Sequence, residues 1–135
     1  MATPVTTTVK LTNFGGATAT LASSTYQPAP PTINNGSVLA TFDQKLLTNT
    51  PGAVVYGIGN VATWIVSWTA DNEVATRILP AGIPVFWTDT WDTLQPKHAE
   101  HSVSMAGVEY VSIADVSSEG GAQTLNAIIE SSRFG

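Results

Sequence analysis

The chain has 135 residues, of which 43% are apolar, so its length and composition suit one domain with a sizeable core. Only 11% of the residues are Asp, Glu, Lys or Arg, against about 25% in ordinary soluble proteins, and the net charge is −5. The five basic residues are scattered and there is no cysteine. These features argue against nucleic-acid binding, attraction to anionic membranes by charge alone, disulfides, thiolate catalysis and cysteine-ligated zinc.

A surface poor in charge favours contact with other surfaces, because little desolvation penalty opposes that contact. We therefore expect self-assembly or membrane contact more than for an average domain. Residues 1–8 lack the basic and apolar regions of a secretory signal peptide, and no apolar run reaches the ~18 residues of a spanning helix. The expectation is synthesis in the cytoplasm, with later release to act on target membranes left open.

The first third of the chain predicts short strands separated by turns. Residues 5–12 alternate apolar and polar side chains, which indicates a half-buried strand; after turn residues at 13–16, a return strand is expected at 17–23. Residues 26–36 contain three prolines, which cannot donate ladder hydrogen bonds, so a loop is expected rather than a central strand. Another strand is expected from 37 to about 44.

Two apolar runs, 53–58 and 62–68, predict a central hairpin, because they are rich in β-branched and aromatic residues and flank a glycine- and asparagine-containing turn. Trp64 and Trp68 both lie on the second run. Side chains alternate along a strand, so these two rings share one face. That face is either core or a surface that meets something apolar, and both interpretations stay open.

The second half predicts further short strands joined by polar segments. In order, these are a turn at 69–73, a strand at 74–79, a strand at 83–91, a polar loop at 92–102, a strand at 108–116, a turn at 117–121 and a strand at 124–130. The last run also fits helical spacing. Eight or nine short strands without a convincing helix predict an all-β fold, an antiparallel β-sandwich that forms a single domain over residues 1–135.

The sequence offers little catalytic chemistry. It contains no nucleophile elbow, phosphate loop or dinucleotide fingerprint. His98, Glu100 and His101 resemble a metal site, but their polar surroundings predict a loop, and a site needs three or four protein ligands. Two solvated loop histidines are the better interpretation. Asp89 and Asp92 flank a tryptophan, but nothing else supports acid–base catalysis. We expect no enzyme activity, cofactor or metal.

Trp87 and Trp91 carry the binding hypothesis. They run from an apolar stretch into a polar one, which looks like a strand end that enters a loop. Exposed aromatics there suit a membrane interface, because the indole ring is apolar while its N–H stays hydrated. Tyr26, beside the proline-rich loop, has the same character. In this hypothesis these three rings insert into membrane lipid, and Asp89 or Asp92 meets a cationic headgroup.

Several features occur in a recognisable order. They are a short N-terminal hairpin, an aromatic at Tyr26, a proline-containing segment at 30–37, a strand centred on Phe42, a Gly-x-Val-x-Tyr-x-Ile strand at 52–58, and, at 67–72, the end of a strand in an aromatic followed by a turn with asparagine. This order resembles the aegerolysin-like family of small fungal and bacterial proteins. The resemblance implies a β-sandwich that binds particular membrane lipids. It also implies action with a larger pore-forming partner protein, in some relatives as an insecticidal two-component toxin.

Two positions depart from the family. Pro51 stands where members often carry an acidic residue that can contact a lipid headgroup, and Tyr26 stands where tryptophan is usual. Two other functions also remain open. A self-assembling structural subunit of a virion or filament, and hence a homo-oligomer, fits the low charge equally well. A carbohydrate-binding module is the third, because tryptophan beside aspartate can stack on a sugar ring.

Overall fold

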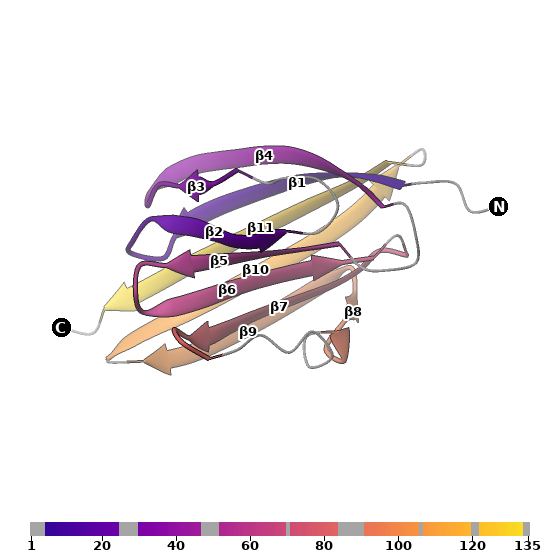
Figure 1. Ribbon diagram of the computed structural model, residues 1–135. Helices are drawn as coiled ribbons and strands as arrows, with labels where there is room; N and C mark the ends of the chain where they lie inside the picture. The colour runs from indigo at the N-terminus through magenta and orange to yellow at the C-terminus, as the bar shows by residue number, and fades with distance from the viewer. Residues whose placement is uncertain are drawn as a thin grey trace.

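The chain forms two sheets packed face to face (Figure 1). The structure, a computed structural model, describes residues 5–24, 30–46, 52–69, 71–83, 91–105, 107–119 and 122–133. These residues contain eleven strands, of which two have only two residues each. The predicted all-β sandwich is confirmed. Nine strands are longer, against eight or nine expected, but they include one at 98–105, where mostly loop was expected, and the strand expected at 83–91 falls largely outside the described residues.

The first sheet has five strands in the order β4-β1-β11-β10-β9. Their bounds are β1 Val5–Phe14, β4 Ser37–Leu46, β9 His98–Met105, β10 Val108–Glu119 and β11 Ala122–Arg133. β1 and β11 run parallel, in register from Thr6 opposite Ala122 to Phe14 opposite Glu130. The other neighbours are antiparallel.

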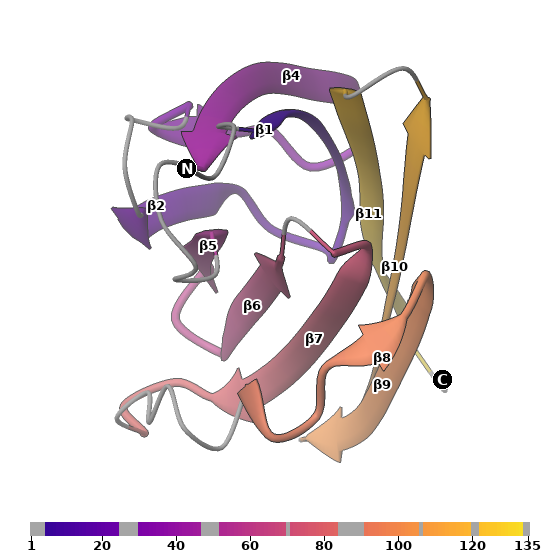
Figure 2. The same cartoon turned by 90° about the vertical axis from the view of Figure 1, so that its right-hand side faces the viewer.

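The second sheet has six strands in the order β3-β2-β5-β6-β7-β8, all antiparallel. Their bounds are β2 Ala19–Ser24, β3 Thr32–Ile33, β5 Gly52–Ile58, β6 Ala62–Trp68, β7 Glu73–Pro80 and β8 Gln95–Pro96. Figure 2 shows β5, β6 and β7 on one side of the sandwich and β10 and β11 on the other. β3, next to the prolines, lies at a sheet edge, as the missing donors require.

The predicted N-terminal hairpin is wrong, because β1 and β2 belong to different sheets. The buried Asn13 directs the chain between them. Its Nδ2 donates hydrogen bonds of 2.9 Å to the carbonyl oxygens of Ala17 and Ile33, and its Oδ1 accepts one from the Gly15 amide. Gly16, at φ +91°, has a backbone conformation that favours glycine.

The predicted central hairpin is confirmed as β5 and β6. Trp64 and Trp68 are completely buried and belong to the core, so the first tryptophan pair is not a docking surface. Tyr56 packs against Trp64 with ring centroids 6.1 Å apart. Ile65, on the opposite face of β6, is also buried. The centre of this sheet is therefore covered on both faces, as a continuous apolar run indicates.

The polar region after the hairpin differs from the prediction. The expected loop at 92–102 contains β8 and most of β9, and the run at 124–130 is part of β11 rather than a helix. Residues 84–90 lie outside the described part of the chain. Trp91 has helical rather than extended backbone, and its carbonyl oxygen accepts a hydrogen bond of 3.2 Å from the Leu94 amide. Among the described residues, no helix is long and apolar enough to cross a membrane.

Candidate functional site

The residues predicted to bind lipid are only partly described. Tyr26, Trp87 and Asp89 lie outside the described residues. Asp92 is exposed, and Trp91 is half-buried. The Trp91 ring nitrogen is covered, so the expected hydrated indole N–H is not found at this residue. The residue as a whole stays partly exposed, and the exposed Asp92 follows it.

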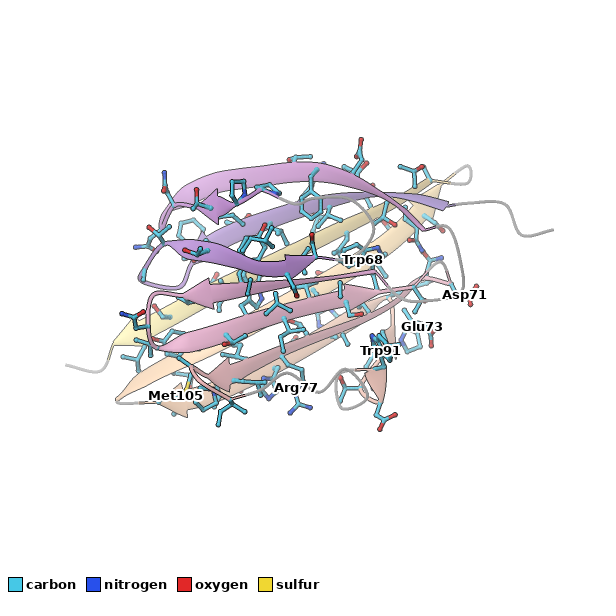
Figure 3. All side chains as sticks on the ribbon, in the orientation of Figure 1. Trp68, Asp71, Glu73, Arg77, Trp91 and Met105 are labelled. Carbon is cyan, nitrogen blue, oxygen red and sulfur yellow. The ribbon has the colours of Figure 1, made fainter. Side chains whose placement is uncertain are left out.

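One end of the sandwich carries these residues. Figure 3 shows Trp68, Asp71, Glu73 and Trp91 there, at the right of the view, and Met105 at the opposite end. We call it the tryptophan end and define it by those first four residues. Asp71 is exposed in the turn between β6 and β7, while Trp68 is sealed beneath the surface.

A buried glutamine fixes the β6–β7 turn to the first sheet. Gln123 Oε1 accepts a hydrogen bond of 2.8 Å from the Thr7 hydroxyl. Its Nε2 donates to the Thr69 carbonyl at 2.8 Å and to Asn72 Oδ1 at 3.2 Å. Asn72, at φ 62°, donates through Nδ2 to the Ser118 hydroxyl at 2.9 Å. The turn is thus positioned by side chains of β10 and β11, and Thr7 of β1 in turn holds Gln123.

A pocket of about 270 Å³ opens between β7 and β9, beside the segment that contains Trp91 and Asp92. It is lined by Thr76 and Arg77 of β7, Thr93, Gln95 of β8, and Ala99, Glu100 and His101 of β9. We call it the Arg77 pocket. In Figure 3 the Arg77 side chain projects from β7 past the lower edge of the sheet. The pocket was not predicted, because its residues are dispersed along the sequence.

The two histidines of β9 have opposite environments. His101 is half-buried, and its Nδ1 accepts a hydrogen bond of 2.9 Å from the Ile78 amide. Burial, with a smaller effect of the Arg77 charge, lowers the pKa of His101. His98 is exposed and forms hydrogen bonds with Asp115 and, at 2.8 Å, with Glu100. These two bonds, the Asp115 bond foremost, raise the pKa of His98.

This pattern corrects the expectation of two loop histidines. Both residues lie on a strand, and only one of them is solvated. No set of three or more His, Asp or Glu side chains in the described ranges is placed to hold a metal ion. The histidines therefore supply hydrogen bonds and a titratable charge to this edge of the sandwich.

The opposite end, which we call the glycine end, holds three exposed large hydrophobic residues: Phe14, Val61 and Ile83, at 43%, 44% and 48% exposure. A pocket of about 340 Å³ lies at the same end, between the β1–β2 and β5–β6 turns and the facing ends of β10 and β11. The Ala81 amide donates to the Val61 carbonyl at 2.9 Å, which joins the segment after β7 to the β5–β6 turn. The sequence signal for this exposed apolar surface was the presence of apolar residues in segments expected to be turns, and it was not recognised.

No protein-family model and no curated protein matches this sequence. The structure is similar to solved structures, among them the crystal structure of the lipid-binding protein Nakanori. That similarity covers 96% of this chain and 72% of the other, with a TM-score of 0.67 and 16% sequence identity. At this identity the match establishes a shared fold, and membership of the aegerolysin-like family stays a prediction.

Proposed function

We propose that this protein is a non-enzymatic β-sandwich that binds membrane lipid. The observation that carries the proposal is the fold, which matches over 96% of the chain that of a protein described as lipid-binding. The surface chemistry supports it, because only 11% of the residues are charged and little desolvation opposes contact with a lipid surface.

The tryptophan end is the proposed membrane-facing surface. Trp64 and Trp68 are sealed in the core, whereas Trp91 is only half-buried and is followed by the exposed Asp92. Indole rings favour the headgroup level of a bilayer. The sequence also predicts membrane insertion of Tyr26 and Trp87 and a headgroup contact at Asp89, all three of which lie outside the described residues. The glycine end, with Phe14 and Val61, is the competing surface.

Vesicle sedimentation tests this assignment. Trp91→Ala is expected to lower the bound fraction several-fold, because it removes apolar ring surface at the interface. Val61→Ser, a change at the exposed competing end, serves as the matched control and is expected to pellet like the wild type. The opposite ranking would move the membrane contact to the glycine end, and wild-type protein that pellets with no lipid mixture would refute the function.

A second measurement uses the unaltered protein and so does not depend on correct folding of the Trp91→Ala variant. Bromine-labelled lipids quench a tryptophan only at close range, and the buried Trp64 and Trp68 supply an unquenched background. We expect partial quenching on binding. Binding without any quenching would exclude tryptophan insertion.

We further propose that the protein is the small component of a two-part membrane-active system that acts after release from the cell. The resemblance to the aegerolysin-like family supports this step. A larger partner would then supply the pore, so this chain alone should bind dye-loaded vesicles without emptying them. Dye release by the chain alone would contradict the two-part scheme. Light scattering after size-exclusion chromatography tests for a homo-oligomer, and large regular particles without lipid would favour the structural-subunit alternative.

A further inference from the structure

We propose that the Arg77 pocket binds the phosphodiester of a phospholipid headgroup. This inference rests on the proposed lipid-binding function and deepens it, because it names the anionic group that is recognised and the side chains that would hold it.

The first support is an available cation. Arg77 lines the pocket, and among the described residues no carboxylate forms an ion pair with it; both ion pairs found there belong to His98. A guanidinium presents several N–H donors in a planar fork that matches two phosphate oxygens. On β7, Arg77 lies between the buried Thr76 and Ile78, so its side chain points to the opposite face of the strand from theirs.

The second support is a set of further hydrogen-bond donors in the lining of the same pocket. Because His101 Nδ1 accepts the Ile78 amide hydrogen, the neutral ring carries its own hydrogen on Nε2, which can donate to a ligand. Gln95, on β8, adds a side-chain amide that can also donate. The pocket thus combines one fixed positive charge with neutral donors from two other strands.

The acidic side chain of the lining sets the charge preference. Glu100 also lines the pocket, and its Oε1 is engaged by His98 Nε2 at 2.8 Å. One carboxylate near one guanidinium disfavours a dianion more than a monoanion. A phosphodiester carries a single negative charge, whereas inorganic phosphate is partly dianionic at pH 7. The pocket therefore favours the lipid phosphodiester over free phosphate.

The position agrees with membrane docking. Thr93 and Gln95 line the pocket, and Trp91 and Asp92 immediately precede them in the chain. An indole at headgroup level would therefore hold the adjoining Thr93 and Gln95 of the pocket lining near the bilayer surface. The two features then act on one lipid surface.

The test compares phosphatidylcholine vesicles with vesicles of digalactosyldiacylglycerol, which has no phosphate. Arg77→Gln is expected to weaken binding to phosphatidylcholine about tenfold or more, because charge-assisted bonds are lost. Arg77→Lys should retain part of the affinity, since the charge stays and the fork is lost. Lys10→Gln, on β1 of the other sheet, removes the same charge outside the pocket and should bind like the wild type. All variants should behave alike on the galactolipid.

A measurement on the wild type keeps the proposal testable if Arg77→Gln fails to fold, which a thermal unfolding scan would reveal. Short-chain phosphatidylcholine below its micelle concentration should shift the His101 ring resonances more than inorganic phosphate does. Equal binding of Arg77→Gln and wild type to phosphatidylcholine, or no His101 shift, would overturn the pocket assignment. A shift with inorganic phosphate alone would overturn the lipid assignment. A shift with the short-chain lipid but no vesicle binding would support the pocket and refute membrane docking.

Discussion

The indole Nε1 of Trp64, on β6, donates a hydrogen bond of 2.7 Å to the hydroxyl of Ser112, on β10, so a polar bond joins the two sheets inside the core. Both side chains are completely buried. The Thr76 hydroxyl donates a hydrogen bond of 3.0 Å to the Ile65 carbonyl. In the hydrogen bond between the Thr76 and Ser112 hydroxyls, Ser112 is therefore the donor. Each hydroxyl hydrogen has one acceptor, and this network favours one alignment of the sheets.

Removal of the Ser112 hydroxyl should therefore destabilise the fold. Ser112→Ala leaves the Trp64 N–H buried without an acceptor, which costs about 1–3 kcal/mol of unfolding free energy. Urea unfolding followed by tryptophan fluorescence measures the loss. Ser104→Ala, at an exposed position on β9, is the control and should stay within about 0.5 kcal/mol. Equal stability of the two variants would mean that the inter-sheet bond contributes nothing net.

Gly52 leaves the space that the Trp68 ring occupies across the β5–β6 pair. A Cβ added to Gly52 would lie 2.6–2.8 Å from three ring atoms of Trp68. Gly52→Ala should therefore force the ring or the strand to move, at a cost of about 1–3 kcal/mol. Thermal unfolding and near-ultraviolet circular dichroism would detect the loss of stability and the displaced indole.

The same strand offers a matched control for this change. A Cβ on Gly57 would approach nothing closer than 3.9 Å, so Gly57→Ala should be tolerated. If both substitutions had the same effect, glycine would matter in β5 for its backbone and not for its contact with Trp68.

The two histidines of β9 should titrate in opposite directions from the ordinary histidine pKa of about 6.5. His98 should titrate above that value, because it bonds Asp115 and Glu100. His101 should titrate below it, because burial and the nearby Arg77 disfavour its charged form. Proton NMR of the imidazole resonances over the pH range measures both, and His98→Gln assigns the first. Coincident titrations would contradict the two environments.

The consequences for stability have opposite signs. The His98 pKa is raised in the folded state, so its contribution is complete below about pH 6.5 and is lost as pH rises through the folded value. The His101 pKa is lowered, so its contribution is present above about pH 6.5 and is lost as pH falls through the folded value. His98→Gln should therefore reduce stability at acidic pH more than at alkaline pH, and a pH-independent effect would contradict this linkage.

Local sequence patterns predicted where the strands lie better than they predicted which strands pair with one another. Alternation at residues 5–12 identified β1 and which of its side chains are buried, but it carries no information on the neighbouring strand. The parallel pairing of β1 with β11 depends on residues more than a hundred positions apart, such as Thr7 and Gln123. For that reason the N-terminal hairpin was predicted where the chain changes sheets.

The candidate site shows the same limit. Trp91 was singled out from its polar neighbours; the structure leaves this residue half-buried with its ring nitrogen covered, and its role in binding stays a prediction. The Arg77 pocket could not be predicted, because β7, β8 and β9 bring Arg77, Gln95 and His101 together only after the sandwich closes. His101 was mistaken for a loop residue because a polar, partly buried edge strand lacks a clear apolar alternation.

The buried Gln123 makes the last prediction. Gln123→Ala removes the acceptor of Thr7 and the donor to the Thr69 carbonyl, and buried groups left unsatisfied cost about 1–3 kcal/mol. The β6–β7 turn should also loosen, because Gln123 is one of the side chains that hold it. Amide hydrogen exchange should therefore accelerate at Thr69, whose N–H donates to the Glu73 carbonyl at 3.0 Å. Asn126→Ala, exposed on the same strand, is the control and should leave that exchange unchanged. Faster exchange over the whole chain without a larger change at Thr69 would show that Gln123 supports global stability and does not specifically hold the turn.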